Sequence, residues 1–386
     1  MYSGKTVLAA ALLGLLPSLA SAEQGVTNAQ VTFAQVAALD GPAGALGQGM
    51  RQGMQAAFEE ANANGGVHGR QIILDSMDDG YEPDRSVVHV KAVIENDNHL
   101  GFIGAVGTPT TAATQPVATA ANMPFVGPFT GAGFLRDASH SNVFNVRATY
   151  FAETEAWIEY LVDQQGMDSI ALLYQDDGFG RVGLAGVTAA LEKRGMTLSA
   201  QGTYTRNTTA VKKALLHIRK AEPDAVVMVG AYKPVAEFIR LSRRIKFEPT
   251  FVNISFVGSD ALAQELGDAG EDVIISQVVP FPWDASLPVV AQYQAALTAF
   301  DAEATPGFVT LEGYLTGRLA IKALENTGAE LTRESFLKAL SELRTVDFGG
   351  VTMSFGPGDN QGMDEVFLTR ITQDGSFQPV VSTGGS

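Results

Sequence analysis

The chain has 386 residues and a formal net charge of −16, with 42 acidic against 26 basic side chains. A surface this acidic argues against nucleic acid as a partner, because binding to phosphate backbones rewards Lys and Arg. The sequence contains no cysteine. This excludes disulfides and a thiolate nucleophile, so the core must hold the fold together by packing alone.

The first residues have the pattern of a cleaved secretory signal. Lys5 precedes an apolar run over residues 7–16, and the small residues Ala20 and Ala22 stand just before Glu23. A basic start, an apolar stretch too short to cross a bilayer and a small-x-small exit are typical of such signals. We therefore expect a signal peptide over residues 1–22 and a mature protein that is soluble in the periplasm. Without a cysteine it has no site for lipoprotein acylation.

Strand-like and helical patterns alternate along the rest of the chain. An apolar run over residues 31–39 ends at Asp40-Gly41-Pro42, and apolar residues spaced by three and four predict a helix over residues 47–63. Further strands are expected at residues 71–75, 100–105, 123–127, 169–174, 225–229 and 251–253, with helices at 153–165 and 183–194. This alternation predicts an α/β fold of βαβ units with largely parallel sheets.

The chain is too long for one ordinary core, and it partly repeats itself. The series of strand, Asp40-Gly41, glycine-bearing loop, helix and strand returns as a strand, residues 177–180, a helix and a strand near residues 198–205. Two similar α/β halves fit a bilobed protein better than one large sheet, although any series of βαβ units produces some likeness without duplication.

The residues that follow the predicted strands indicate a binding site. In open parallel sheets, ligands bind beyond the carboxyl ends of the strands. Here those positions are small, hydroxyl-bearing or aromatic, and include Thr108, Thr110, Phe129, Thr130, Phe179, Tyr232 and Phe256. Such residues suit a modest ligand held by apolar contacts and a few hydrogen bonds.

Motifs for catalysis and metal binding are missing from the sequence. The five histidines are scattered, and neither a metalloprotease pair, a nucleophile elbow nor a phosphate-binding loop occurs. The glycines of residues 41–47 have the wrong spacing for a dinucleotide fingerprint. The acidic doublets at residues 78–79 and 176–177 have the residue types of a catalytic acid–base pair. Such doublets more often cap helices or shape turns. We expect a binding protein, not an enzyme, with no metal or other cofactor.

A series of short motifs resembles the Leu/Ile/Val-type solute-binding proteins of ABC importers, which have the type I periplasmic binding fold. The resemblance covers about residues 31–366, and its marks, in chain order, are Asp40-Gly41-Pro42, residues 61–70, Met77-Asp78-Asp79, Ile103-Gly104, Thr114-Gln115-Pro116, residues 176–180, Gly230-Ala231-Tyr232 and Glu312-Gly313-Tyr314. Each motif is short, and their order and spacing together are specific.

The resemblance implies two Rossmann-like lobes with parallel sheets, joined by a three-segment hinge. The crossings would lie near Arg147, near residues 278–282 and near residues 348–351. The first lobe would then comprise residues 23–147 with 279–348, and the second residues 148–278 with 349–386.

The resemblance also implies a function and partners. A periplasmic substrate-binding protein, acting as a monomer, would capture a small molecule between its lobes and hand it to permease subunits in the inner membrane. A ligand-sensing receptor of the same fold, feeding a regulator or a sensor kinase, is the alternative that the sequence leaves open.

The family's binding positions in the first lobe fall on five residues here. Thr108 or Thr110 would offer a hydroxyl to the ligand carboxylate, and Thr130 a second one. Phe129 would form a wall, and Leu46 stands where many relatives have an aromatic residue.

In the second lobe, the resemblance points mainly to aromatic residues. Phe179 takes a position often held by Tyr, and Tyr232 matches a tyrosine that closes over the ligand. The remaining expected ligand-binding residues are Tyr150, Ser255, Phe256 and Phe281. We expect two or three of the aromatic residues to be core filler instead.

One departure from the family concerns the ligand's ammonium group. Relatives that bind α-amino acids hold the ammonium with a carboxylate of the second lobe, whereas residues 147–152 and 253–257 offer no acid at that place. Glu153 or Glu312 would substitute only if the alignment shifts by a residue or two. Burying an ammonium without a counter-charge is costly. The expected ligand is thus a branched-chain or hydrophobic amino acid or a small aliphatic or aromatic carboxylate.

Overall fold

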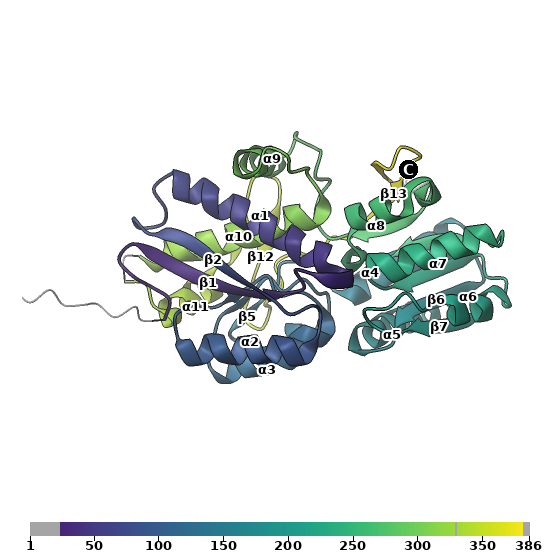
Figure 1. The fold of residues 1–386 in the computed structure, drawn as a ribbon, viewed down its shortest axis with the longest axis horizontal. Helices are drawn as coiled ribbons and strands as arrows, with labels where there is room; N and C mark the ends of the chain where they lie inside the picture. The colour runs from purple at the N-terminus through teal and green to yellow at the C-terminus, as the bar shows by residue number, and fades with distance from the viewer. Residues whose placement is uncertain (1–23, 329, 381–386) are drawn as a thin grey trace, which may run out of the picture.

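Two α/β lobes lie end to end in the computed structural model, which describes residues 24–328 and 330–380 (Figure 1). The first lobe contains a five-stranded sheet in the order β2-β1-β3-β4-β5, and the second a seven-stranded sheet in the order β14-β13-β10-β9-β8-β6-β7. The predicted fold of two largely parallel lobes is confirmed. The predicted signal peptide lies outside the described residues.

The first sheet is parallel throughout and covered on both faces. Its strands are β1 (Gln30–Ala37), β2 (Gln71–Asp78), β3 (Phe102–Ile103), β4 (Phe125–Val126) and β5 (Val143–Phe144). The covering helices are α1 (Gly44–Ala63), α2 (Pro83–Asn96), α3 (Thr108–Ala120), α9 (Pro288–Phe300), α10 (Phe308–Thr327) and α11 (Arg333–Glu342). The apolar run of β1 is buried on both faces, as is usual when helices cover a parallel sheet.

The second lobe repeats this arrangement and adds an antiparallel edge. Its strands are β6 (Ile170–Gln175), β7 (Ala200–Tyr204), β8 (Ala225–Val229), β9 (Thr250–Asn253), β10 (Ile274–Gln277) and the antiparallel β13 (Phe367–Ile371) and β14 (Phe377–Pro379). The order β7-β6-β8-β9-β10 matches β2-β1-β3-β4-β5 position by position. The repeat expected from the sequence is therefore present in the topology.

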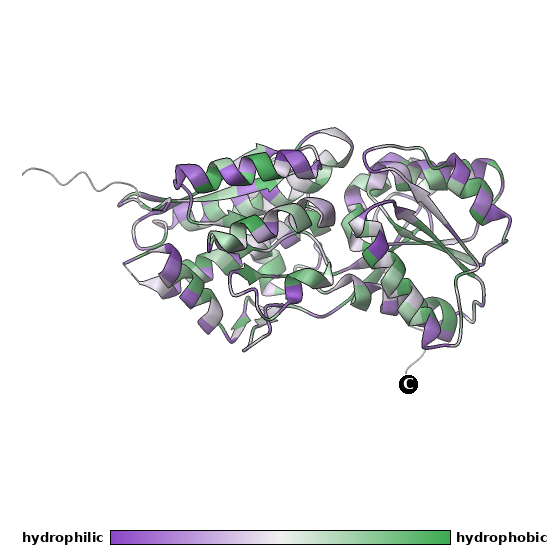
Figure 2. Cartoon of the chain, turned by 90° about the horizontal axis from the view of Figure 1, so that it is seen from below, coloured by the Kyte–Doolittle hydropathy of each residue, from purple (hydrophilic) through white to green (hydrophobic). Residues whose placement is uncertain are grey.

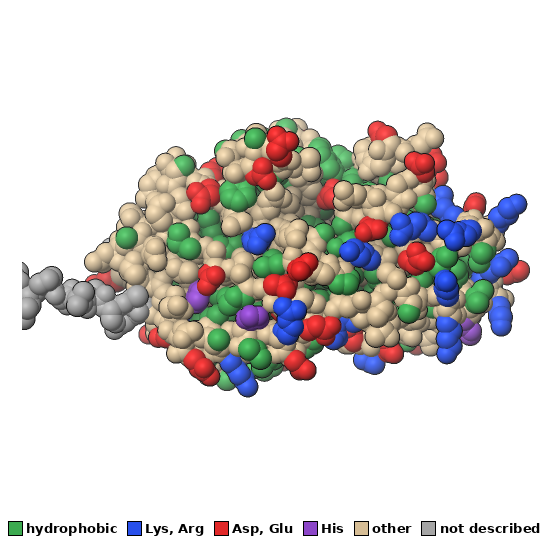
Figure 3. Space-filling view, in the orientation of Figure 1, with side chains coloured by type: hydrophobic (Ala, Val, Ile, Leu, Met, Phe, Trp, Pro, Cys, Tyr) green, Lys and Arg blue, Asp and Glu red, His purple; other side chains and the backbone are tan. Residues whose placement is uncertain are grey.

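The helices of the second lobe are amphipathic and enclose its sheet. They are α4 (Tyr150–Ile158), which continues as a π-helical turn over Glu159–Gln164, α5 (Gly178–Glu192), α6 (Lys212–Arg219), α7 (Tyr232–Arg244) and α8 (Ser259–Leu266). Figure 2 shows hydrophobic strands inside the lobe and hydrophilic outer faces on the helices. Lys and Arg side chains gather on this lobe in Figure 3, so the negative net charge is unevenly distributed over this face.

Glycines allow α1 and α10 to pack closely. A Cβ at Gly53 would lie 1.9 Å from the carbonyl oxygen of Thr310, and one at Gly313 would lie 2.4 Å from that of Met50. Side chains at these positions would push the helices apart. The close approach fixes the first turns of α1 and α10 at the boundary between the lobes.

The third crossing between the lobes differs from its predicted place. Strands β11 (Thr345–Asp347) and β12 (Thr352–Ser354) form a hairpin, and the chain after it stays on the first lobe. The amide of Asn145 donates to Asn360 O at 2.7 Å, and that of Gly362 donates to Asn145 O at 2.8 Å. These contacts argue against a crossing at residues 348–351. We propose that the first lobe extends to Met363 and that the third crossing follows it.

Candidate ligand-binding site

Five aromatic side chains from both lobes meet at the lobe boundary. Phe129 and Tyr81 belong to the first lobe, and Tyr150, Phe179 and Phe256 to the second. The ring centroid of Phe256 lies 4.7 Å from that of Phe179, 5.5 Å from that of Phe129 and 5.9 Å from that of Tyr81. Tyr150 packs on Phe179 at 5.4 Å. Each is at most 1% exposed, so the lobes are closed over this aromatic cluster.

Strand ends position these rings, as the sequence predicts. Phe129 follows β4, and Phe256 lies in the 3-10 turn Ser255–Val257 that follows β9. Phe179 lies in the first turn of α5, where Asp177 caps the helix by accepting the amide of Phe179 at 3.0 Å. The carboxyl ends of both sheets therefore face each other across the cluster.

A pair of buried hydroxyls lies beside Phe129. Thr108 Oγ1 and Thr130 Oγ1 are 2.7 Å apart, and both side chains are buried. Thr110 is oriented differently, because its hydroxyl donates to the carbonyl of Val106 at 2.5 Å within the first turn of α3. Of the two hydroxyls expected in this loop, that of Thr108 is the one paired with Thr130.

Leu46 and Tyr232 link the lobes outside the cluster. Leu46, in α1, is so close to the second lobe that a Cβ at Gly258 would lie 2.4 Å from its Cδ2. The Tyr232 hydroxyl, from the first turn of α7, accepts the amide of Ala45 at 3.4 Å. Phe281 is not brought to the cluster, because its ring packs on Trp283 and Phe308 at 5.0 and 6.0 Å. It belongs to a separate aromatic group.

Arg147 and Glu312 form a buried ion pair under the cluster. Arg147 Nε and Nη2 donate to the two carboxylate oxygens of Glu312, each at 2.7 Å, and the side chains are 1% and 3% exposed. The guanidinium carbon lies 4.2 Å above the Phe129 ring centroid. Burial by itself lowers the pKa of Arg147, but the charge and hydrogen bonds of Glu312 outweigh it and raise that pKa. Both carboxylate oxygens of Glu312 therefore bind Arg147.

Glu153 is also occupied. Its Oε1 accepts the hydroxyl of Ser255 at 2.9 Å, and its Oε2 accepts the amide of Ser255 at 2.8 Å and the hydroxyl of Ser276 at 2.5 Å. Burial raises the pKa of Glu153, although the charge of Arg147 and these hydrogen bonds oppose the rise. Ser255, expected at the ligand, instead binds this carboxylate.

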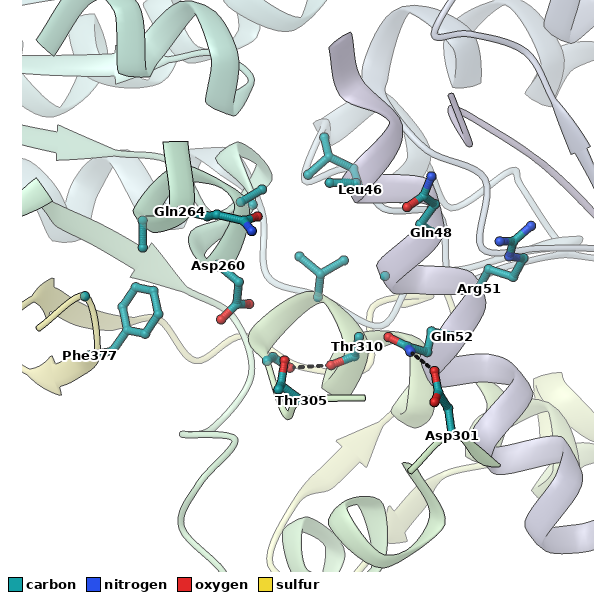
Figure 4. A pocket seen from close by; sticks show the side chains of 18 of the residues that line it. Leu46, Gln48, Arg51, Gln52, Asp260, Gln264, Asp301, Thr305, Thr310 and Phe377 are labelled. Atoms are coloured by element: carbon teal, nitrogen blue, oxygen red, sulfur yellow. Dashed lines mark hydrogen bonds between the residues drawn. The ribbon is translucent and has the colours of Figure 1, made fainter. Parts of the chain in front are cut away.

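A hollow of about 850 Å³ lies elsewhere on the lobe boundary, between α1 and α8 (Figure 4). Leu46 and polar side chains such as Gln52 and Asp260 line it, and Gln52 bonds to Asp301 at 3.5 Å. None of the five cluster residues is among its lining residues. The aromatic rings and the paired hydroxyls lie outside this hollow. We take the cluster as the candidate site because rings of both lobes meet there beside two buried hydroxyls.

Residues 30–376 match the family model of periplasmic binding proteins. The chain belongs to the periplasmic binding protein family. A solved structure described as a possible leucine/isoleucine/valine-binding protein from Rhodopirellula baltica is 37% identical, with a TM-score of 0.87, over 92% of this chain and 97% of that one. A substrate-binding periplasmic protein from Ralstonia solanacearum is 27% identical, with a TM-score of 0.85, over 91% of this chain and 100% of that one.

Sequence relatives agree with these structures. The Leu/Ile/Val-binding protein homolog 7 of Brucella abortus is 22% identical over 96% of each chain. The resemblance to Leu/Ile/Val-type proteins is thus confirmed, and family membership implies a periplasmic location. In the described part of this periplasmic binding protein, no helix is long and apolar enough to cross a membrane, and no group of three His, Asp or Glu side chains is arranged around a metal site.

The sequence does not identify two residues of the candidate site, Tyr81 and Arg147. Tyr81 lies three residues after β2 ends at Asp78, and this position beyond a strand end is the feature from which it could have been predicted. Arg147 was predicted only as a crossing, because nothing in its sequence neighbourhood points to Glu312, which is 165 residues away.

The sequence also does not predict a polar contact between the lobes of this periplasmic binding protein. Arg206, after β7, binds Glu82 of the first lobe at 2.7 Å and Asp177 of its own lobe at 3.2 Å. Asn207 donates to Glu82 at 2.7 Å and to the carbonyl of Gly80 at 3.1 Å. Glu82 therefore joins the lobes in this closed arrangement.

Replacing Glu82 with alanine should weaken ligand binding about fivefold without removing a proposed ligand contact. A partly exposed ion pair with an added hydrogen bond contributes about 1 kcal/mol to closure, and the apparent affinity falls with the closed population. Calorimetric titration at low and high salt measures this, and the loss should shrink at high salt. Lys193→Ala, which breaks an ion pair within the second lobe, should leave affinity unchanged; an equal loss there would contradict the prediction.

Glu153 should make stability fall as the pH rises above 4.5, the ordinary pKa of a glutamate. Burial raises the pKa of this carboxyl in the folded protein, so the unfolded chain loses the proton at a lower pH than the folded protein does. Between the two pKa values, ionisation therefore favours the unfolded state. Glu153→Gln cannot ionise, and its free energy of unfolding relative to the wild type should increase as the pH passes upward through this range. Urea denaturation of both proteins across the acid range measures the difference.

Glu155, on the same helix, provides the control with the opposite sign. Burial alone raises its pKa, but hydrogen bonds from Lys193 and Arg194 outweigh burial and lower it below 4.5. Glu155 therefore adds stability as the pH rises toward 4.5. The stability of Glu155→Gln relative to the wild type should decrease over that range. Differences of the same sign for both variants would show that Glu153 is not penalised by burial.

Proposed function

We propose that this protein captures a small, partly apolar solute between its lobes and delivers it to the permease subunits of an ABC importer. The aromatic cluster carries the proposal, because both lobes contribute to it and closure buries it completely. Rings and a buried hydroxyl pair provide apolar contact and a few hydrogen bonds, as small-molecule sites do. Relatives named as Leu/Ile/Val-binding proteins support a ligand of that size, and membership of this family supports a binding role over a catalytic one.

The ligand-binding residues that we propose lie at the lobe boundary. They are Leu46, Thr108, Phe129, Thr130, Tyr150, Phe179, Tyr232 and Phe256, to which we add Tyr81. Thr110 and Ser255 are left out because their hydroxyls are used by the α3 turn and by Glu153. Phe281 is left out because it packs on Trp283 and Phe308.

We further propose that residues 1–22 are the signal that exports the protein. Protein purified from a periplasmic fraction should then begin at Glu23. Sequencing its amino terminus tests the cleavage site, and a protein that retains residues 1–22 would contradict it.

A thermal-shift screen against amino acids, aliphatic acids and aromatic acids tests the proposed function. A ligand at 100 times its dissociation constant adds about 2.7 kcal/mol to stability, and small-angle scattering should show the protein becoming more compact with the same compound. Cells that lack the protein should lose uptake of that compound. The proposal would be overturned if no compound of the three classes stabilised the folded protein, or if a bound compound were chemically converted.

A further inference from the structure

Two hydrogen-bonding groups at the cluster are buried and unpaired. Among the described residues, Arg147 Nη1 and the Tyr150 hydroxyl have no hydrogen-bond partner within 3.5 Å, although the Tyr150 side chain lies near enough to Thr130 to interact with it. Arg147 is 1% exposed and Tyr150 is 0% exposed. Leaving a buried polar group unpaired costs about 1–3 kcal/mol, and more when it is charged. Two such groups in one place point to a polar ligand atom that they bind.

Both groups lie beside the paired hydroxyls. Glu312 takes Nε and Nη2, which form one edge of the planar guanidinium, so Nη1 points away from Glu312. The guanidinium is stacked on Phe129, whose chain neighbour Thr130 holds Thr108. The amide of Tyr150 donates to Gly131 O at 2.8 Å, which places the start of α4 beside this loop. A cation and three hydroxyls therefore converge on the loop 128–132.

The charges nearby favour an anion. Arg136 ends the 3-10 turn Gly133–Arg136 that follows this loop, and its partners among the described residues are uncharged acceptors, namely Gln361 and the carbonyls of Thr130, Ala132 and Arg147. Burial and the neighbouring charge of Arg147 lower the pKa of Arg136 to about 9. A bound anion relieves the repulsion between these two guanidinium groups.

The buried acids leave no partner for an ammonium. Across the described residues, the buried carboxylates are those of Asp79, Glu153 and Glu312. Asp79 accepts the Tyr81 amide at 2.8 Å and the Ser86 hydroxyl at 2.7 Å. Glu153 accepts three hydrogen bonds, and Glu312 holds Arg147. A ligand ammonium would have to share one of these carboxylates, and the charge of Arg147, which pairs with Glu312 and acts on Glu153, makes its burial costly.

We infer that the ligand is a small organic monocarboxylate that carries no ammonium on its α-carbon, and that Arg147, positioned by Glu312, binds its carboxylate together with the Tyr150 hydroxyl. The aromatic cluster receives an aliphatic or aromatic body. A guanidinium suits this task because it stays charged when buried and, with one edge bound to Glu312, still has donors on Nη1. This inference rests on the proposed function, since it names the ligand class of the same site.

Calorimetric titration with matched compounds tests the ligand class. Isocaproate is leucine without its ammonium, and isocaproamide lacks the carboxylate charge as well; hydrocinnamate and phenylalanine form the aromatic pair. We expect isocaproate or hydrocinnamate to bind at least about tenfold more tightly than its amino acid, and the amide to bind more weakly than the acid by a similar factor. An amino acid that binds more tightly than its deaminated match would overturn the inference and leave the proposed function standing. If no acid or amino acid binds the folded protein, both fail.

Two variants separate binding from folding. Tyr150→Phe removes a hydroxyl that has no partner, so it should preserve the stability of the ligand-free protein while weakening acid binding about tenfold. The double variant Arg147→Met with Glu312→Met removes both buried charges and should weaken acid binding about 30-fold or more. Unchanged acid affinity in either folded variant would overturn the assignment of that residue. A loss of stability in Tyr150→Phe as large as its loss of affinity would show that the hydroxyl has a structural role instead.

Discussion

Replacing Glu312 with alanine should lower the free energy of unfolding by about 3–5 kcal/mol. The substitution leaves Arg147 charged, 1% exposed and without the carboxylate that now takes two of its nitrogens. A buried charge that loses its partner keeps its desolvation cost and loses the attraction that offsets it. Urea denaturation of the wild type and the variant measures the difference.

Removing both charges should restore most of that loss. In Arg147→Met with Glu312→Met no ion remains buried, and apolar pairs of similar volume often replace buried ion pairs at little cost. Lys193→Ala is the exposed control, since its side chain is 65% exposed and its ion pair with Glu155 contributes less than about 1 kcal/mol. If the double variant were no more stable than Glu312→Ala, the unpaired charge would not be the cause of the loss.

Replacing Phe256 with alanine should lower the stability of the closed protein by about 3–5 kcal/mol. Phe256 is fully buried and touches rings of both lobes, namely Phe179 in its own lobe and Phe129 and Tyr81 in the other. Truncation therefore removes contacts within the second lobe and contacts that hold the lobes together. We expect a lower urea midpoint, a larger radius of gyration in scattering and weaker ligand binding.

Phe281→Ala is the matched control for Phe256→Ala. Phe281 is an aromatic residue near a crossing, but it packs on Trp283 and Phe308 outside the cluster. Its truncation should lower stability to a smaller extent, because the ring is only partly buried, and it should leave ligand affinity unchanged. If Phe281→Ala weakened binding as much as Phe256→Ala, the site would extend to this second aromatic group.

Local pattern and chain order predicted much of the architecture. The predicted strand at residues 225–229 coincides with β8, and the predicted helix at residues 47–63 ends with α1 at Ala63. These segments are predictable because their period and composition match one kind of secondary structure. Thr108, Phe129, Phe179 and Phe256 lie together at the lobe boundary, because each follows a strand end and the carboxyl ends of parallel strands share one edge of a sheet. Their contact with a ligand stays a prediction.

The sequence does not predict the contacts of residues whose partners are distant along the chain. Thr110 and Thr108 are equivalent by position, and only the turn of α3 decides that one hydroxyl binds a backbone carbonyl while the other meets Thr130. Phe281, like Phe256, is an aromatic residue that the sequence assigns to the site, but its ring packs on Trp283 in another aromatic group. The third crossing that we propose lies later than the one the sequence predicts, because the chain is held on the first lobe by contacts with Asn145, which lies more than 200 residues back along it.

The sequence by itself therefore determined the two-lobed α/β fold and the family, and it predicts binding at the strand ends, because local periodicity and motif order suffice for these. Only the tertiary structure decided which buried groups are already paired. Glu153 and Glu312, the two acids considered as partners for an ammonium, are occupied by serines and by Arg147. Arg147 Nη1 and the Tyr150 hydroxyl are left unpaired. Whether a buried group has a hydrogen-bond partner depends on groups brought together from distant segments, so it cannot be read from a local sequence pattern.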